Sequence, residues 1–233
     1  YILKVTKNII FMAQSISKQK QIKPLRVRRI QERTEVARSK LINAGMPLFA
    51  EKGFDAVSIK DIEIAADVKR GMLIYHFHDK ENFWKAVADS TFNQIEYQKD
   101  LRLDIMSDIS DREGLALMIR FFVRSYAQHP EVSRLMAQEA RQDSWRIDYL
   151  VVTHIRPGTI ELEKHVRKIL NLSAREFAHW YYIMLSASAT IFSFQPECKR
   201  LFGFDPRNEE VIEAHADMIV RMLLNKINNP NTI

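Results

Sequence analysis

The chain has 233 residues, of which 46% are hydrophobic and 27% are charged, with only six glycines and seven prolines. This length is enough for a small domain and a larger one, since single domains commonly run to about 100–150 residues. Few glycines and prolines with ordinary apolar content are typical of a helical globular protein. The single cysteine, Cys198, excludes an internal disulfide and argues against a thiolate metal site.

Positive charge is concentrated at the N-terminus. Residues 1–33 contain nine Lys or Arg and one Glu, a net charge of +8, so the other 200 residues sum to −2 of the total of +6. We interpret residues 1–32 as a flexible basic arm that binds DNA phosphates or reaches a minor groove; the alternative is a solvated tail. Because Tyr1 is not an initiator methionine, we expect natural translation to begin at Met12.

The sequence favours a cytoplasmic protein without a membrane partner. The apolar run Ile9–Ala13 is too short for the core of a signal peptide. The longest uncharged run, Trp180–Pro196, is shorter than the roughly 20 residues that a membrane-spanning helix needs, so it is better interpreted as a buried helix.

A first helix is predicted from about Thr34 to Lys52, where Gly53 ends it. Pro47 lies inside this helix, where it removes one backbone hydrogen bond and costs roughly 3 kcal/mol unless the helix kinks. Residues at helical spacing form its inner face: Leu41, Gly45, Leu48 and Phe49. We expect this helix to support the two that follow.

Ser58 and Asp61 form a capping-box pattern, which predicts a second helix beginning at Ile59. Its narrow apolar face includes two alanines, which allow another helix to approach closely: Ile59, Ile62, Ala65 and Ala66. Asp67 and Val68 are expected to turn the chain after it.

A third, short helix is predicted from about Lys69 to His76, with Leu73 and Phe77 turned inward. A helix this short is not stable alone, so its neighbour must hold it. Its remaining sides carry cationic, aromatic and small groups, which suit entry into a DNA major groove. These groups belong to Arg70, Gly71, Met72, Ile74 and Tyr75.

A turn at His78 and Asp79 should be followed by a long helix from Lys80 to about Leu101, capped by Asp79. Glu81 in its first turn is favoured by the helix dipole. The apolar residues of this helix are Phe83, Val87, Phe92 and Ile95.

In one unbroken register, the segment Leu41–Trp84 resembles the DNA-binding domain of the tetracycline-repressor (TetR) family of bacterial transcription regulators. The matching positions are Ala44, Leu48 to Glu51, Gly53, Phe54, Ser58, Ile62, Ala65, Ala66, Val68, Gly71, Leu73, Tyr75 to Phe77, Lys80 and Glu81. The departures are Asp67 at a turn position usually held by glycine, Lys69 at a capping position usually held by a small polar residue, and Ile74 in place of a tyrosine.

The resemblance implies an all-α protein with an N-terminal three-helix helix-turn-helix DNA-binding domain at residues 33–79. A C-terminal helical bundle at residues 80–233 would bind a ligand and dimerise. The implied function is that of a homodimeric repressor that binds a palindromic double-stranded DNA operator and is released by a small-molecule inducer. Such a regulator is not an enzyme and needs no cofactor. The helix from Lys80 would transmit ligand binding to the DNA-binding domain.

The resemblance assigns phosphate contacts to Tyr75, His76 and Lys80, and their phenol, imidazole and ammonium groups are suitable donors. The alternative for His76 is a packed core position. Arginine can bind guanine bidentately, and two apolar side chains could touch thymine methyl groups. The predicted DNA-binding set is Ser58, Lys69 (phosphate), Arg70 (base), Gly71, Met72 (base), Ile74 (base), Tyr75, His76 and Lys80.

The rest of the chain predicts a helical body. The expected helices are one opened by a capping box at Ser110–Glu113, then Glu131–Gln142, Trp145–Ile155, Thr159–Leu170, one opened by a capping box at Ser173–Glu176 and reaching Phe194, and Asn208–Asn228. A break or kink is expected at Arg156–Gly158.

The helix that reaches Phe194 is slim at Ser186–Ala189, so we expect it to pair with its copy across a two-fold axis together with the last helix. The seam of the last helix is predicted at Val211, His215, Met218, Ile219, Met222 and Leu223. A dimer would place two DNA-binding domains roughly 34–36 Å apart, one turn of DNA.

Aromatic, thioether and amide side chains of the body could line an inducer pocket, or they could simply form its core. The predicted pocket residues are Phe92, Met118, Phe122, Tyr126, Gln138, Trp145, Tyr149 and Tyr181.

A helical-bundle metalloenzyme is the alternative from a different class. Glu176 and His179 form one Glu-x-x-His unit, but a carboxylate metal site needs a second unit, which the sequence lacks. Glu161 and His165 could also hold a metal, but a solvated pair explains them. Two further alternatives keep DNA binding: a ligand-independent DNA-binding protein and an activator.

Overall fold

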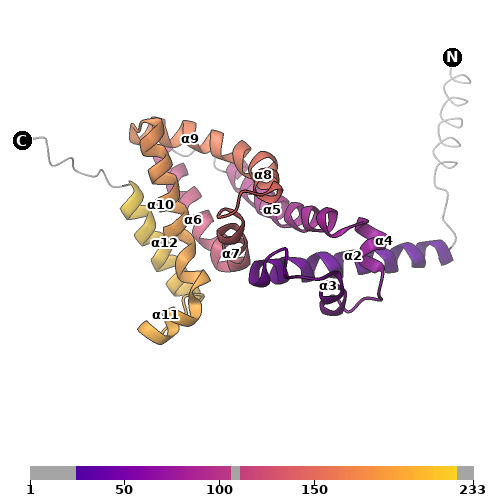
Figure 1. The fold of residues 1–233 in the computed structure, drawn as a ribbon. Helices are drawn as coiled ribbons and strands as arrows, with labels where there is room; N and C mark the ends of the chain where they lie inside the picture. Colours follow the sequence, from indigo (N-terminus) through magenta and orange to yellow (C-terminus); the bar gives the residue numbers. More distant parts are fainter. Residues whose placement is uncertain (1–24, 106–110, 225–233) are drawn as a thin grey trace, which may run out of the picture.

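The computed structural model describes residues 25–105 and 111–224, with side chains described at residues 33–97 and 111–224. Within these ranges the chain forms helices and no strands, which confirms the predicted all-α class (Figure 1). Two predictions lie outside the residues whose side chains are described: the basic arm at residues 1–32 and the expected translation start at Met12.

The N-terminal helices are α2 (Leu25–Lys52), α3 (Ile59–Ala65), α4 (Met72–Phe77) and α5 (Lys80–Ile105). The predicted start of α2 at Thr34 is wrong, because the preceding residues include Arg, Gln and Glu, which are good helix formers. The predicted start of α4 at Lys69 is also wrong, because the helix cannot extend through the left-handed φ of 87° at Gly71. Pro47 lies within α2.

The C-terminal helices are α6 (Asp111–Gln128), α7 (Pro130–Glu139), α8 (Trp145–Leu150), the π-helix η1 (Val151–Ile155), α9 (Arg156–Leu170), α10 (Ala174–Ser193), α11 (Gln195–Phe202) and α12 (Glu209–Leu224). The Ser173 capping box opens α10 as predicted. Ser110, the first residue of the other predicted box, is outside the described ranges. The break predicted at Arg156–Gly158 is wrong, because these residues form the first turn of α9, where the missing N–H of Pro157 is tolerated; the irregular segment is η1, just before them. Helix α11 was not predicted from the sequence.

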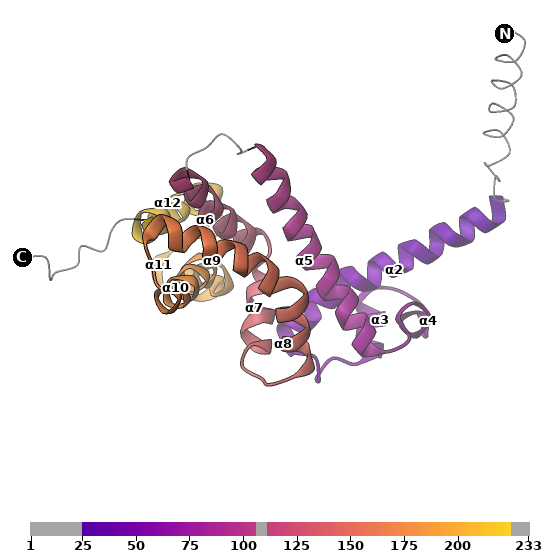
Figure 2. The same cartoon turned by 90° about the horizontal axis from the view of Figure 1, so that it is seen from above.

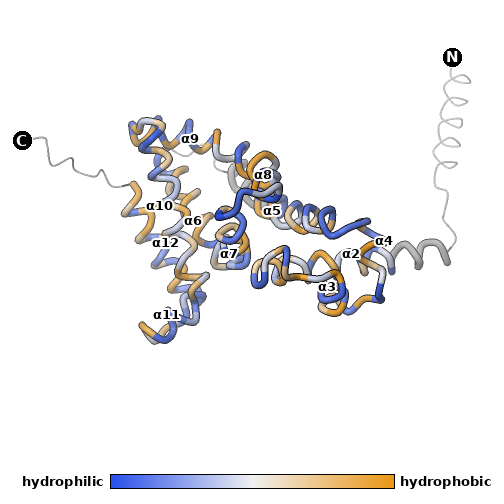
Figure 3. Tube along the Cα trace, viewed as in Figure 1, coloured by the Kyte–Doolittle hydropathy of each residue, from blue (hydrophilic) through white to orange (hydrophobic). Residues whose placement is uncertain are grey.

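Two hydrophobic cores divide the molecule. The N-terminal core is built by α2 to α5 around residues such as Phe49, Ile62 and Trp84, and the C-terminal core is built by α6, α9, α10 and α12. Helices α7 and α8 follow α6 in the chain, yet their buried residues Val132, Leu135 and Leu150 belong to the N-terminal core. Figure 2 shows α7 and α8 lying between the C-terminal bundle and the crossing of α2 with α5. The colouring in Figure 3 shows apolar and polar residues alternating along both groups of helices, as amphipathic packing requires.

Glycine brings α2 and α5 close together. A Cβ at Gly45 would lie 2.5 Å from Cγ2 of Val87 and 2.8 Å from Cζ of Phe83, both on α5. Gly45 is therefore required by its surroundings at this crossing.

The chain passes between the two cores at two described places. Ala127 at the end of α6 is in the C-terminal core and Val132 in α7 is in the N-terminal core, with the His129–Pro130 step between them. The return runs through η1, from Leu150 in the N-terminal core towards Leu162 in the C-terminal core. Among the described helices, none is long and apolar enough to cross a membrane.

Candidate nucleic-acid interface

The capping box at the start of α3 forms as predicted. The Asp61 N–H donates to Ser58 Oγ at 3.1 Å, and the Ser58 N–H donates to the Asp61 carboxylate at 3.1 Å. The hydroxyl of Ser58 also donates to this carboxylate and holds the pKa of Asp61 below its usual value. This reciprocal arrangement satisfies two backbone donors and sets the direction of α3. Within α3, Ile62 is buried, but Ala65 is exposed, so the predicted inward position of Ala65 is wrong.

Asp67 makes the turn between α3 and α4 with a left-handed φ of 50°, the conformation that glycine usually supplies. Its carboxylate lies 3.1 Å from Nζ of Lys40 on α2. The side chain that replaces glycine therefore links the turn to the supporting helix.

A carboxylate from α3 holds the start of α4. Gly71 at the N-terminus of α4 offers no side-chain cap, and the backbone N–H of Leu73 instead donates to Glu63 Oε1 at 3.0 Å. Glu63 is buried although it is an acid, because it satisfies one of the free donors of this helix end. This role of Glu63 was not predicted from the sequence; its signal is an acidic residue next to the buried Ile62, ahead of a helix that has no capping residue of its own.

The face of α4 that points away from the core is accessible. Leu73 and Phe77 are buried, as predicted, while Tyr75 is 68% exposed. Most of the other predicted DNA-binding residues are exposed too: Ser58, Lys69, Arg70, Gly71 and Ile74. Met72 is half-buried and packs against the N-terminal core, so it projects less freely than Ile74.

His76 is half-buried, and its Nε2 atom is buried without a hydrogen-bond partner among the described residues. Burial, and then the positive charge of Arg38 on α2, lower the pKa of His76. The imidazole is therefore held towards its neutral form, which can still donate one hydrogen bond to a phosphate.

Lys80 lies where the N-terminal helices meet α8. Its Nζ is 4.2 Å from the centre of the Phe54 ring, whose other contacts include the Arg146 guanidinium, 4.9 Å from the ring centre. Burial lowers the pKa of Lys80. Lys80 thus makes a cation–π contact in the free protein.

The predicted pocket residues divide into two groups. Phe92, Trp145 and Tyr149 pack against the N-terminal core, and Gln138 donates from Nε2 to the Ala50 carbonyl of α2 at 2.8 Å. The other four pack in or against the C-terminal core: Met118, Phe122, Tyr126 and Tyr181. Burial raises the pKa of the phenols of both Tyr126 and Tyr181.

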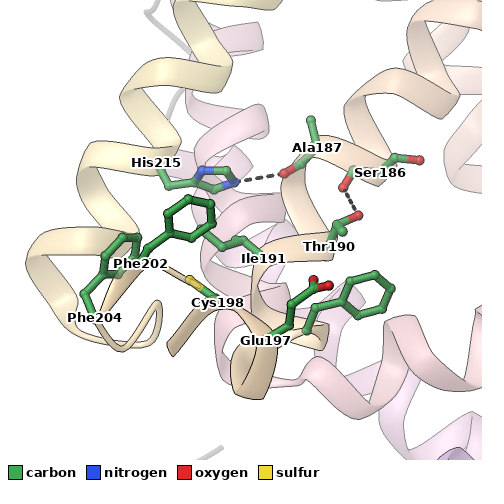
Figure 4. Close-up of a pocket in the computed structure, with 10 residues that line it drawn as sticks. Ser186, Ala187, Thr190, Ile191, Glu197, Cys198, Phe202, Phe204 and His215 are labelled. Carbon is green, nitrogen blue, oxygen red and sulfur yellow. Dashed lines mark hydrogen bonds between the residues drawn. The ribbon is translucent and has the colours of Figure 1, made fainter. Parts of the chain in front are cut away.

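A cavity of about 620 Å³ lies elsewhere, between α10, α11 and α12 (Figure 4). Its lining is largely apolar, with His215 on α12 bound to the Ala187 carbonyl through Nε2 at 2.9 Å. The other lining residues are Ser186, Thr190, Ile191, Phe194, Glu197, Cys198, Phe202 and Phe204. None of these residues was among the predicted pocket residues.

The carboxylate of the Glu-x-x-His unit has a structural role. Glu176 accepts a hydrogen bond from the Ser173 N–H at 2.8 Å and completes the capping box of α10. In the described ranges, no three His, Cys, Asp or Glu side chains are arranged to hold a metal ion.

A helix-turn-helix unit with an accessible second helix, joined by a long helix to a helical body, defines a DNA-binding transcriptional regulator. Residues 41–87 match the family described as bacterial regulatory proteins, tetR family. The biofilm operon icaADBC HTH-type negative transcriptional regulator IcaR of Staphylococcus epidermidis is 24% identical over 157 residues, which are 62% of this chain and 82% of that protein.

Solved structures show the same fold. FadR, a fatty acid degradation regulator from Bacillus halodurans, superimposes with a TM-score of 0.63 at 14% identity over 82% of this chain and 96% of that one. FadR from Bacillus subtilis, solved in complex with stearoyl-CoA, has a TM-score of 0.59 at 16% identity over 81% of this chain and 98% of that one. Residues 41–87 thus match the DNA-binding part of the tetR family, and the described chain as a whole shares the fold of solved transcriptional regulators.

Proposed function

We propose that this protein is a homodimeric repressor that binds a palindromic operator through α4 and is released by a small-molecule inducer in the cytoplasm. The observation that carries the proposal is the geometry of α4. Its inner side is fixed by Leu73, Phe77 and the Glu63 cap, while the phenol of Tyr75 and the guanidinium of Arg70 face outward. A short helix held in this way can enter a major groove without losing its shape.

The contacts divide by chemistry. Arg70 is proposed to bind a guanine edge, and Ile74 and Met72 to touch thymine methyl groups. Lys69, Tyr75, His76 and Lys80 are proposed to bind phosphates, with Ser58 and Gly71 beside them at the starts of α3 and α4. To reach a phosphate, the ammonium of Lys80 would leave the face of the Phe54 ring.

The exposed apolar face of α10 and α12 supports the dimer. Several large apolar side chains remain exposed in the single chain: Tyr182 and Ile183 on α10, Phe194 just after it, and Met218 and Met222 on α12. Large apolar side chains exposed on neighbouring helices favour a protein interface, and a two-fold partner presents the same surface. The predicted seam of α12 divides accordingly: Ile219 is buried within the chain, and the two methionines face outward.

The dimer is proposed to have two conformations that differ in the spacing of their DNA-binding domains. The inducer would bind one conformation more tightly than the other. The body offers aromatic and phenolic side chains, including the partly buried Tyr126 and Tyr181. The complex of Bacillus subtilis FadR with stearoyl-CoA supports a ligand role for this fold, although it does not identify the inducer of this chain.

The test is selection of genomic DNA fragments by the purified protein at physiological salt, followed by footprinting. A palindromic site protected on two half-sites is expected. Binding without sequence preference would contradict the proposal.

Two alanine variants assign the contacts. Arg70→Ala should weaken the sequence preference at one base pair per half-site. The expected loss of discrimination against the wrong base is about 1–3 kcal/mol. Lys69→Ala should lower the affinity for all DNA sequences alike and reduce the dependence of that affinity on salt. Equal losses on specific and random DNA for Arg70→Ala would contradict its base-reading role.

Sedimentation tests the dimer. Met218→Lys together with Met222→Lys should produce monomers, because it places charge on the proposed interface. The matched control is Glu210→Lys, which adds charge at an exposed position near the start of α12. A double variant that still sediments as a dimer would place the interface elsewhere.

A further inference from the structure

The long helix α5 meets the C-terminal half of the molecule at the Trp145 and Tyr149 side chains of α8 and at the short π-helix η1. Its closest helix neighbours in the described ranges are α2, α4 and the π-helix η1. Figure 2 shows α5 running apart from α10 and α12. The segment that meets α5 is also the place where the chain returns from the N-terminal core to the C-terminal core.

One carboxylate on α5 is shared by two donors at this contact. The Tyr149 hydroxyl on α8 donates to Asp89 Oδ1 at 2.7 Å, and His154 Nε2 on η1 lies 2.9 Å from the same oxygen. Hydrogen bonds to an ionised carboxylate are short and strong, and both distances are in that range. Burial and the hydrogen bond to Asp89 raise the pKa of Tyr149 to about 12, which keeps the phenol protonated and able to donate.

Packing fixes the histidine of this contact. The His154 ring stacks on Phe92 with centroids 5.0 Å apart and planes 18° apart, and its side chain is 7% exposed. Phe92 lies one turn after Asp89 on α5, so one face of α5 supplies both the acceptor and the stacking surface. One turn before Asp89, Nζ of Lys85 lies 5.6 Å from the centre of the Tyr149 ring.

We propose that Asp89, Tyr149 and His154 form a latch that sets the angle between α5 and the C-terminal body, with Asp89 as its positioning residue. The latch joins the helix that carries the DNA-binding domain to the π-helix through which the two cores are connected. A π-helix is rare, is usually a single turn and occurs often at functional sites, so η1 is a suitable segment to change shape when the latch opens. This inference deepens the proposed function, and it rests on that function only for its effect on DNA.

A distance measurement tests the latch without DNA or inducer. Spin labels are attached at exposed positions on α3 and α9 through Lys60→Cys and Lys164→Cys, with the buried Cys198 replaced by alanine. Labelled protein is diluted with unlabelled protein, so that pulsed electron spin resonance reports the distance within one chain. The parent should give one narrow distance distribution.

The latch variants should change that distribution. Asp89→Ala removes the acceptor of both hydrogen bonds and should shift or broaden it. Tyr149→Phe removes one hydrogen bond but keeps the ring that packs against Trp84, and should broaden it less. Glu210→Gln is the control, since it removes an exposed carboxylate on α12, a helix that carries neither a label nor a latch residue. It should leave the distribution unchanged.

An Asp89→Ala distribution that superimposes on that of the parent would overturn the latch. Circular dichroism checks that each variant is folded, and if Asp89→Ala is not, an unchanged Tyr149→Phe distribution overturns it instead. Operator affinity is measured in parallel and should fall about tenfold for Asp89→Ala, within the usual range of coupling between sites. If the parent binds no operator, the proposed function fails while the distance result still decides the latch.

Discussion

The N-terminal core encloses an ion pair, whereas the C-terminal core carries its ion pairs on the outside. Arg146 Nε lies 2.7 Å from Glu139 Oε2, with side chains 8% and 2% exposed, between α8 and α7. Around the C-terminal core, Arg124 on α6 binds Glu213 on α12 bidentately at 2.6 and 2.5 Å, and both side chains remain partly exposed.

This difference indicates where each region tolerates change. A buried pair fixes one arrangement because neither charge can be left without its partner, whereas exposed pairs can be lost and replaced by water. The Arg146 guanidinium also stacks on Phe54, the residue that follows Gly53 at the end of α2. The junction of α7 and α8 with the DNA-binding domain is therefore specified tightly, and the C-terminal bundle is specified mainly by shape.

The largest effect is expected from Arg146→Ala. It leaves the Glu139 carboxylate buried and unpaired, which should lower the free energy of unfolding by about 3–5 kcal/mol. Urea unfolding measures the loss, and Arg141→Ala is the matched control because Arg141 is exposed on the same stretch of chain. A loss similar to that of the control would show that the pair does not specify the junction.

Gly45→Ala should destabilise by about 1–3 kcal/mol, because its Cβ would overlap Val87 and Phe83 at the crossing of α2 and α5. Gly114→Ala is the control in the C-terminal region, since a Cβ there meets no atom within 4 Å. Within a helix this control should stabilise by roughly 0.5–1 kcal/mol. Thermal unfolding should show a lower melting temperature for Gly45→Ala and a higher one for Gly114→Ala. A Gly45→Ala variant with unchanged stability would contradict the close approach of α2 and α5.

Glu63→Ala should cost about 1–2 kcal/mol, because it removes the acceptor for the Leu73 N–H at the start of α4. Hydrogen exchange of the Leu73 amide should become faster, while amides of α10 keep their rates. Glu51→Ala, at an exposed position on α2, serves as the control. Unchanged exchange at Leu73 would show that the cap does not hold α4.

The smallest effect is expected from Glu213→Gln, at an exposed pair. Hydrogen bonds from Arg124 hold the folded pKa of Glu213 below its usual 4.5. The stabilisation that this ion pair gives is therefore present when the pH is above the usual pKa of the glutamate. It is lost as the pH falls through the pKa of Glu213 in the folded protein. At pH 7 the variant should lose about 0.2–1 kcal/mol, and at pH 3 the difference from the parent should shrink.

Unfolding at the two pH values checks this sign, with Glu210→Gln, another exposed glutamate of α12, as the control. A Glu213→Gln variant that loses the same amount at both pH values would show that the pair contributes nothing through charge.

Local sequence signals predicted much of the fold. The capping boxes at Ser58 and Ser173 fixed the starts of α3 and α10, because the side chain and the backbone donors it satisfies lie within one turn. Asp79 likewise accepts from the Asn82 N–H at 2.6 Å at the start of α5. The inward positions of Leu73 and Phe77 followed from helical spacing, and the all-α class followed from composition and the family resemblance.

Only the tertiary structure decided which helices share a core and which side chains serve α4. The sequence order groups α7 and α8 with the body, but burial places Leu135 and Leu150 with the DNA-binding domain. Glu63 lies 10 residues before the Leu73 amide that it caps, and Asp89 lies 60 residues before the Tyr149 hydroxyl that it binds. Contacts over such separations depend on how whole helices cross, which no short pattern in the chain encodes.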